Sequence, residues 1–531
     1  MSIDKDWWKG AVIYQIYPRS YCDSSGNGTG DLPGITGKMD YIASLGVDAI
    51  WLSPFQKSPM KDFGYDVSDY CDVDPLFGDL SDFDAFVSAA HDHGIKVIID
   101  MVLSHTSDQH PWLDESRQSR DNPKSDWYVW ENPKADGTAP NNWLSVFGGS
   151  AWQYDSHRGQ YYLHSFLTSQ ADLNLHNPDV QDAVLDACRF WLERGVDGFR
   201  LDAMSHYFHH LSLQDNPAAE ANFGNTQLDH LDPYNMQYHK FDKAQPEVYD
   251  FLKRIRSLMD EYNATMTVGE VGEDDPLRAS GRYTAGDSML HTCYNLSLMV
   301  GQDKKLTAET IREPLEYYEA LDEAGWPAWA FCNHDVVRVV SRWGKQNNGE
   351  FNPNFAKMLI ALLTSLRGTV FIYQGEELGL PEAELAYEDL QDPWGIYLYP
   401  KWQGRDGCRT PMIWSADAKT NFGFSTHTVK PWLPISDKHI GKDAATQDQD
   451  PNSVLNFTRA FLQKRKTLPA LVKGDIRFVE TGSDTLLAFT RSFEGQHVEC
   501  IFNFADHAQS FNGKEIAAFG AVFDTNKALA A

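Results

Sequence analysis

The sequence predicts an α/β fold: a barrel of eight parallel strands alternating with helices, a domain inserted after the third strand, and an antiparallel β domain at the carboxyl end. Two observations support this prediction. Short apolar runs that end near glycine or an acidic residue alternate with segments of helical periodicity along most of the 531 residues. The strand and helix pairs number eight, which is the number that closes a (β/α)8, or TIM, barrel.

The first three strands and the helices between them are the clearest elements. Strands are expected at 12–18, 49–54 and 96–102, where apolar residues dominate. A helix is expected at 35–45, and a second helix, capped by Ser81, precedes the third strand. Strand, helix and strand in this order predict a parallel sheet with crossover helices.

The alternation breaks after the third strand. Residues 105–174 are rich in Trp, Pro, Asn and Gly and are too many for a connecting loop, so we expect an inserted domain there. The barrel would then comprise 1–104 and 175–468, and short alternating runs predict a β domain at 469–531. The remaining barrel strands are expected at 196–201, 266–271, 291–295, 328–332 and 369–373.

Charge and composition limit the function classes. The 46 Lys and Arg against 75 Asp and Glu give a net charge of −29, which would repel phosphates and excludes a nucleic-acid or anionic-membrane partner. There is no apolar stretch of signal-peptide or membrane-spanning length, and the seven cysteines are scattered without a Cys-x-x-Cys pair. We therefore expect a cytoplasmic protein with reduced cysteines, either a monomer or a weak homo-oligomer.

Acidic residues follow four of the predicted strands. Barrel enzymes take catalytic groups from the carboxyl ends of several strands, so these side chains should converge on one face. Arg200 should keep Asp202 ionised, while burial should raise the pKa of Glu270. An ionised carboxylate beside a protonated one, in an aromatic-rich barrel mouth, suits glycosidic bond cleavage. The four acids are Asp100, Asp202, Glu270 and Asp335, with His105 and His334 close by in sequence.

The chain resembles the α-amylase family of glycoside hydrolases, family 13, over nearly its whole length. The family's ordered signatures appear at 100–105 (Asp-Met-Val-Leu-Ser-His), 198–202 (Gly-Phe-Arg-Leu-Asp), 268–270 (Val-Gly-Glu) and 333–335 (Asn-His-Asp). The resemblance implies a retaining double displacement on small oligosaccharides, without an organic cofactor. By this resemblance Asp202 is the nucleophile, Glu270 is the acid and base, and Asp335 holds hydroxyls of the distorted sugar.

Within the family the chain is most similar to the α-glucosidase and oligo-1,6-glucosidase group. Residues 170–174 (Gln-Ala-Asp-Leu-Asn) and 404–412 (Gly-Arg-Asp-Gly-Cys-Arg-Thr-Pro-Met) match that group. The similarity implies that Tyr65 and Asp62 contact the non-reducing glucose and that Arg409 faces Asp62. A pocket closed by this ion pair would select chain ends; the alternative is an ordinary structural ion pair.

Other positions follow from the same resemblance. His105, Arg200 and His334 match residues that contact the sugar. Phe147 and Phe166 fit positions that line the acceptor side, although they could equally be core aromatics of the inserted domain.

Two features bear on substrate preference. In this group valine after the nucleophile goes with α-1,6 preference and smaller or polar residues go with α-1,4, so Ala203 implies an α-1,4 enzyme for maltose-like substrates. The discrimination from one methyl-sized difference is only about 1–3 kcal/mol. The segment 204–244 is long and polar, and we expect it to form a lid over the pocket mouth that favours disaccharides. The alternative is a loop packed against the barrel away from the site.

A glycine-rich segment near the amino terminus has the style of a Ca²⁺ loop, with oxygen-bearing side chains on alternate residues. Relatives in the group carry a similar loop that binds Ca²⁺ or Mg²⁺ structurally. Here Ser25 replaces an Asn and Asn27 an Asp, which lowers the charge and therefore the affinity. We expect a structural Ca²⁺ or Mg²⁺, with a hydrogen-bonded turn as the alternative. The ligands would be Asp23, Ser25, Asn27, Thr29 and Asp31.

Competing functions remain within the same fold. The main alternatives are an oligo-1,6-glucosidase and a sucrose- or trehalose-type transferase or isomerase. Residues 336–343 lack the Arg- and Asp-rich loop of sucrose isomerases. Transglucosylation is expected in any case, since a sugar hydroxyl can intercept a retaining intermediate. A non-catalytic relative, such as the ectodomain of an amino-acid transporter heavy chain, would predict a membrane span and damaged catalytic residues, and the sequence has neither.

Overall fold

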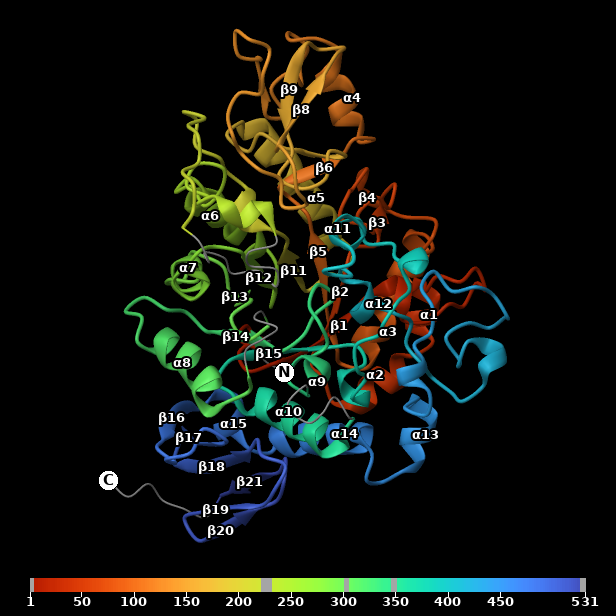
Figure 1. Cartoon of the computed structure of the whole chain (residues 1–531), viewed down its shortest axis with the longest axis vertical. Helices are drawn as coiled ribbons and strands as arrows, with labels where there is room; N and C mark the ends of the chain where they lie inside the picture. Colours follow the sequence, from red (N-terminus) through yellow and green to blue (C-terminus); the bar gives the residue numbers. More distant parts are fainter. Residues whose placement is uncertain (1–3, 221–231, 300–304, 345–350, 526–531) are drawn as a thin grey trace.

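The computed structural model describes residues 4–220, 232–299, 305–344 and 351–525. Eight parallel strands close a barrel, and a four-stranded antiparallel sheet follows near the carboxyl end (Figure 1), which confirms the predicted fold class. The barrel strands are β1 (Val12–Ile16), β2 (Ala49–Leu52), β5 (Lys96–Met101), β11 (Gly198–Leu201), β12 (Met266–Val271), β13 (Thr292–Asn295), β14 (Ala328–Ala330) and β15 (Thr369–Tyr373).

The barrel strands are buried on both faces. Every residue of β1, β2, β11 and β15 is buried, because side chains fill the barrel inside and helices cover it outside. The register between strands brings distant charges together. On β11, Arg200 lies opposite Asp100 of β5 on one side and opposite Val268 of β12 on the other.

The helices follow the predicted alternation, with two differences. The helix expected at 35–45 is divided into α1 (Leu32–Thr36) and α2, with Gly37 as the C-cap of α1. Asp79, and not Ser81, caps α3, because its carboxylate accepts the backbone N–H groups of Ser81 and Asp82. The larger barrel helices are α2 (Met39–Leu45), α3 (Leu80–Asp92), α5 (Pro178–Glu193), α6 (Val248–Met259), α7 (Pro276–Tyr283), α8 (Ala308–Glu319), α10 (Pro353–Ser365) and α14 (Val454–Lys466).

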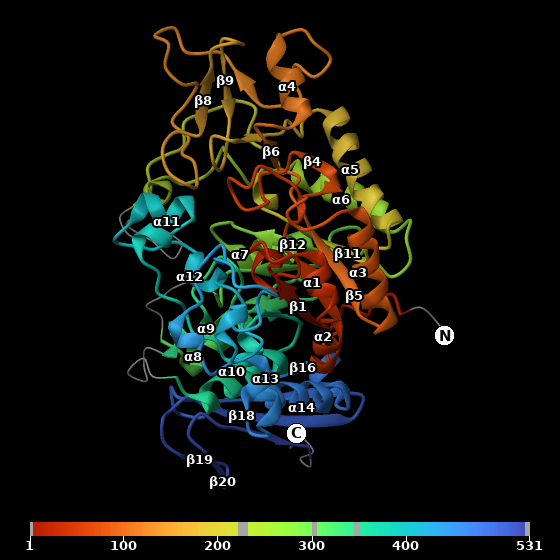
Figure 2. The same cartoon turned by 90° about the vertical axis from the view of Figure 1, so that its right-hand side faces the viewer.

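The segment between β5 and α5 forms a separate layer, coloured orange to yellow in Figures 1 and 2, above the carboxyl ends of the barrel strands. Its first and last strands pair with each other, which joins both ends of the insertion at the barrel. A small core of its own surrounds Trp143 and Trp152, whose stacked rings are 5.9 Å apart. Its elements are β6 (His105–Ser107), α4 (Pro111–Gln118), β7 (Trp130–Glu131), β8 (Trp152–Asp155), β9 (Gln160–Leu163) and β10 (Gln170–Asp172).

The C-terminal sheet lies at the opposite end of the barrel (Figure 2), far from the inserted domain. Arg491 ties it to the barrel by donating hydrogen bonds to the carbonyls of Ser365 and Leu366 at the end of α10. No helix in the described ranges has both the length and the apolar character needed to cross a membrane. The sheet consists of β16 (Asp475–Val479), β17 (Leu486–Phe493), β18 (Gln496–Asn503) and β21 (Ala521–Asp524).

Candidate active site

A cavity of about 640 Å³ opens at the carboxyl ends of the barrel strands, beneath the inserted domain. Most of the side chains predicted to bind or cleave the substrate line it. Arg200, His334 and Arg409 do not line the cavity themselves but contact residues that do. The predicted residues on the wall are Asp62, Tyr65, His105, Phe147, Phe166, Asp202, Glu270 and Asp335.

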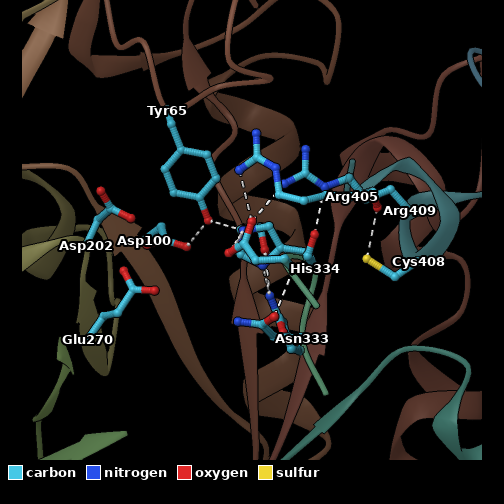
Figure 3. Close-up of polar contacts among 12 residues, drawn as sticks. Tyr65, Asp100, Asp202, Glu270, Asn333, His334, Arg405, Cys408 and Arg409 are labelled. Atoms are coloured by element: carbon cyan, nitrogen blue, oxygen red, sulfur yellow. Dashed lines mark hydrogen bonds and ion pairs between the residues drawn. The ribbon is translucent and has the colours of Figure 1, made fainter. Parts of the chain in front are cut away.

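Three carboxylates surround the guanidinium of Arg200. Nη1 of Arg200 lies 2.7 Å from Oδ1 of Asp100 and also contacts Oδ1 of Asp202, while Nη2 lies 2.6 Å from Oε2 of Glu270. Figure 3 shows Asp202 and Glu270 on the same side of the site, next to Asp100. The strand register explains this arrangement, since Arg200 lies opposite Asp100 and Glu270 is two residues beyond Val268.

Burial and the shared guanidinium control protonation. Burial raises the pKa of Asp202 well above its ordinary value, against the attraction of Arg200 and with added repulsion from Glu270. Burial also raises the pKa of Asp100 to about 6. One positive charge therefore faces three carboxylates, and removal from water favours protonation within the cluster. The raised pKa of Asp202 runs against the expectation that Arg200 keeps this group ionised, because Asp100 and Glu270 share the same guanidinium.

Two donors hold the carboxyl group of Glu270. Its Oε2 accepts the backbone N–H of Ala203 at 3.1 Å, and its Oε1 accepts the hydroxyl of Tyr294 at 3.4 Å. Ala203 has φ 42°, in the left-handed region that most side chains avoid. This turn directly after Asp202 aims the N–H of Ala203 at Glu270 and so couples the two carboxylates through the backbone.

His334 is a neutral hydrogen-bond relay behind the sugar site. Burial lowers its pKa to about 3. The side-chain amide of Gln15 donates to Nδ1 at 2.7 Å, so Nε2 carries the proton and faces the hydroxyl of Tyr65 at 2.6 Å and Oδ2 of Asp335 at 3.2 Å. The ring of Tyr65 is parallel to the imidazole with centroids 5.5 Å apart. The relay fixes the side chains of Tyr65 and Asp335, and Figure 3 shows the hydroxyl of Tyr65 pointing toward His334.

The ion pair at the closed end of the cavity differs from the prediction. Asp62 pairs with Arg405 and not with Arg409, with 3.2 Å between Oδ1 and Nη2. Arg409 pairs instead with Oδ1 of Asp335 at 2.8 Å and donates to the carbonyl of His334 at 2.7 Å. Arg405 also reaches Oδ1 of Asp335 at 3.1 Å. The sequence Arg-Asp-Gly-Cys-Arg contains two arginines that could pair with Asp62. Arg405 is the N-cap of the short helix α12 (Asp406–Arg409) and Arg409 is its last residue, so the sequence alone does not distinguish them.

Arg405 has a further anchor that was not predicted from the sequence. The buried carboxylate of Asp392 accepts Nη2 of Arg405 at 2.8 Å, Nε at 3.0 Å and the backbone N–H at 2.7 Å. Asp392 is also the N-cap of α11 (Pro393–Leu398), where it accepts the N–H of Trp394. Trp394 and Arg405 line the cavity. The sequence signal was weak, since Asp before Pro at a helix start is common.

The protonation of Asp62 predicts a pH dependence of substrate binding. Burial raises its pKa to about 6, although Arg405 opposes the rise. The folded protein binds this proton more tightly than the unfolded chain, so the contribution to stability is present in acid and is lost as the pH rises through 6. Below pH 6 the protonated carboxyl group of Asp62 no longer accepts hydrogen bonds from both Nη2 of Arg405 and Nε2 of Gln170.

We therefore expect KM to rise as the pH falls below 6, while kcat follows other groups. The measurement is the pH profile of KM for the wild type and for Asp62→Asn, in which KM should be higher and independent of pH in this range. An unchanged acid rise of KM in that variant would assign the titration to another group.

The inserted domain contributes one wall of the cavity. Nε2 of Gln170 donates to Oδ2 of Asp62 at 2.9 Å, and Nε2 of His105 donates to the carbonyl of Tyr65 at 3.1 Å. The rings of Phe147 and Phe166, with centroids 6.1 Å apart, line the cavity and are not part of the domain's core around Trp143. Gln170 lies in a motif that was recognised in the sequence without a role for this side chain.

The predicted lid lies partly outside the described residues, which omit 221–231. On either side of that gap, the segment 204–244 places several polar side chains on the cavity wall. His206 lies against Phe166, with ring centroids 5.1 Å apart. The preference for disaccharides stays a prediction. The wall residues from this segment are Ser205, His206, Tyr234, Asn235, His239 and Lys243.

No residue of the predicted metal loop at 23–31 lines the cavity. Asp23 and Asp31 are buried, and the ion pairs of the described chain include no cationic side chain for either of them. Their oxygens accept N–H and hydroxyl groups of the loop itself, such as the N–H of Gly26 at 2.7 Å and that of Ser25 at 3.0 Å. The loop brings only two carboxylates together, and no group of three or more His, Cys, Asp or Glu side chains that could hold a metal ion is found in the described residues. A Ca²⁺ or Mg²⁺ ion would therefore depend on neutral oxygen ligands and would have to compete with these hydrogen bonds.

We expect added Ca²⁺ to raise Tm by about 2 °C with weak affinity, since a ligand of the folded state stabilises it by mass action. Thermal melts with and without a chelator would measure the shift. Asp31→Asn, which removes one charge and keeps the side-chain size, should abolish it. A chelator-independent Tm would leave the hydrogen-bonded turn as the correct interpretation.

A barrel whose mouth holds paired carboxylates and an aromatic, ion-paired sugar-sized cavity is the site of a glycoside hydrolase. Residues 15–474 match the family described as alpha amylase, catalytic domain. The protein belongs to the α-amylase family and is a glycoside hydrolase.

The chain is similar in sequence and structure to several proteins of this family. The chain is 56% identical to a "probable alpha-glucosidase" of Rhizobium meliloti over 95% of this chain and 90% of that protein. It is 36% identical to an "oligo-1,6-glucosidase" of Heyndrickxia coagulans over 96% of this chain and 94% of that protein. The crystal structure of the alpha-glucosyl transfer enzyme XgtA aligns with a TM-score of 0.93 and 50% identity, covering 98% of this chain and 99% of that one.

Proposed function

We propose that the protein is a retaining, exo-acting α-glucosidase that releases glucose from the non-reducing end of short α-1,4-linked glucosides such as maltose, and that also transfers glucose to sugar acceptors. The observation that supports this proposal most directly is the ion-paired wall of the cavity, where Arg405 ties Asp62 to Asp335. A chain cannot pass this ion-paired wall, so only a terminal glucose fits beside the catalytic carboxylates. The names of the relatives support a glucosidase.

The two carboxylates that share Arg200 suit a double displacement. Asp202 attacks C1 of the glucose and forms a glycosyl ester, while Glu270 gives its proton to the departing glycosidic oxygen. In the second step the oxygen of a water molecule, or of an acceptor hydroxyl, attacks C1 and displaces the carboxylate of Asp202. Glu270 takes the proton of that water or hydroxyl as the attack occurs. Asp335 accepts sugar hydroxyls, and Arg200 offsets the negative charge that moves between the two acids.

Ala203 provides a test of linkage preference. Its side chain lines the cavity, and its φ of 42° is a conformation that a β-branched residue strongly disfavours. We expect Ala203→Val to raise activity on isomaltose relative to maltose about tenfold and to lower Tm through backbone strain. Ala203→Ser, which adds a polar atom without branching, is the matched control. An isomaltose to maltose ratio unchanged by valine would remove Ala203 as the linkage determinant.

One observation favours transfer as a substantial second activity: the 50% identity to the alpha-glucosyl transfer enzyme XgtA. The structure gives less support to a sucrose isomerase. The arginines that follow β14 are turned away from the cavity, since Arg338 donates to the carbonyls of Gln374 and Cys408, and Arg342 to those of Leu298 and Phe331. These side chains therefore do not hold a fructose unit at the mouth.

The deciding experiment is a time course of products from maltose, isomaltose, sucrose and maltotriose. Rapid release of α-glucose from maltose, with trisaccharides at high maltose concentration, is the expected result. Formation of a sucrose isomer, or faster cleavage of isomaltose, would establish one of the alternatives. Equal rates on maltose and on long maltodextrins would contradict the lid prediction. A cytoplasmic location and a monomeric or weakly associated state stay predictions from the sequence.

A further inference from the structure

Exposed large apolar side chains are concentrated in and around α11, whose Trp394 lines the cavity. The described residues include nine such side chains, and four of them fall between 387 and 399. Tyr397 is the most exposed of the four, at 60%. Such clustering marks a binding surface more often than scattered exposure does. The mouth patch, as we name it, consists of Tyr387, Ile396, Tyr397 and Tyr399.

The mouth patch is continuous with the cavity through the rings of α11. Trp394 of α11 lines the cavity and meets Phe147 edge to face at 5.7 Å. One helical turn further on, Tyr397 lies over the backbone of the inserted domain, because a Cβ at Gly148 would be 3.0 Å from its Cε1. Figure 2 shows α11 below the loops of the inserted domain. Aromatic surface therefore extends from the catalytic cavity to the outside.

We propose that the mouth patch, centred on Tyr397, is a second acceptor subsite that binds the outer glucose of a maltose-type acceptor during transfer. The inference rests on the proposed function. Trp394, which lines the cavity, lies one helical turn from Tyr397, so an acceptor sugar that extends outward past Trp394 meets this patch. The apolar C–H face of a pyranose packs on an aromatic ring, and the ring of Tyr397 offers such a surface.

The surroundings of the patch favour a sugar over a second copy of the chain. Glu388 and Asp389 are an exposed and a half-buried acid beside Tyr387, and they offer acceptors for sugar hydroxyls. A net charge of −29 opposes self-association through an acidic surface. Asp392 holds the start of α11 through Trp394 and Arg405, so the rings are presented on a fixed support.

The test compares Tyr397→Ala with two other variants. Tyr397→Phe keeps the ring, and Tyr154→Ala removes another exposed tyrosine, 45% exposed, on β8 of the inserted domain and outside the cavity wall. The assay measures glucosyl transfer to maltose and to methyl α-glucoside, which has no outer sugar. Tyr397→Ala should lower the ratio of transfer to maltose over transfer to methyl glucoside by about three- to tenfold, the loss expected for one aromatic contact. Tyr397→Phe and Tyr154→Ala should keep the wild-type ratio.

A binding measurement separates this inference from the proposed function. Calorimetry with maltotriose on the Glu270→Gln protein should show the same three- to tenfold weakening when Tyr397→Ala is added, whatever linkage the active enzyme prefers. Failure of the wild type to cleave maltose would contradict the proposed function alone. Unchanged maltotriose affinity and transfer ratio in Tyr397→Ala would overturn the subsite, and so would a change of oligomeric state in place of these effects.

Discussion

Asp202→Asn should reduce kcat on maltose by at least about 10⁴-fold, since an amide does not form the glycosyl ester through which the reaction passes. The loss should occur without a loss of stability. Burial and neighbouring acids disfavour the charge of Asp202, so an uncharged isostere relieves repulsion around Arg200 and should leave Tm unchanged or slightly raised. Activity assays and thermal melts on the same preparation measure both effects.

Azide separates a nucleophile from a structural carboxylate. In Asp202→Gly, azide should enter the vacated space and turn an activated aryl α-glucoside into β-glucosyl azide, because a single displacement inverts C1. In Glu270→Gln the nucleophile remains, so azide should attack the glycosyl enzyme and give α-glucosyl azide. Wild-type turnover in Asp202→Asn, or the same azide anomer from both variants, would contradict the assigned roles.

Arg405→Met should reduce kcat/KM on maltose by about 10²- to 10³-fold, mostly through KM, because it leaves the sugar-binding carboxylates without their shared partner. The same change should cost about 3–5 kcal/mol of stability, since Asp392 becomes a buried, unpaired charge. Kinetics on maltose and denaturant unfolding give the two numbers.

A double variant distinguishes the two effects of Arg405. Adding Asp392→Asn to Arg405→Met removes the buried orphan charge, so stability should recover while KM stays high. Recovery of KM together with stability would mean that Arg405 acts only by holding the fold. Arg409→Lys is the matched comparison, since Arg409 contacts Asp335 but not Asp62.

The strand ends could be located from the sequence because side-chain alternation and apolar runs are local properties. The carboxylates at these ends then followed from the barrel, since parallel strands present the same ends to one mouth. The sharing of Arg200 could not be predicted, because it depends on the register between β5, β11 and β12, which apolar runs do not encode. A shift of one residue would have moved Arg200 away from Asp100.

The partner of Asp62 could not be settled from sequence for a different reason. Arg405 and Arg409 are four residues apart at the start and end of α12, and both are long enough to reach the closed end of the cavity. The choice is made by Asp392, a residue of another loop that turns Arg405 toward Asp62. The helix cap at Asp79 is a smaller example, where two neighbouring residues both qualify as caps and the backbone decides.

The guanidinium that joins Asp100, Asp202 and Glu270 also affects proton transfer during turnover. Burial raises the pKa of both Asp100 and Asp202 around the one guanidinium of Arg200, and the first half of the proposed reaction delivers a proton to the departing sugar. The second half returns a proton to Glu270 from water or an acceptor. In the proposed double displacement, the proton given to the departing sugar is therefore returned to the same carboxyl group within each cycle, so one complete turnover consumes no net proton.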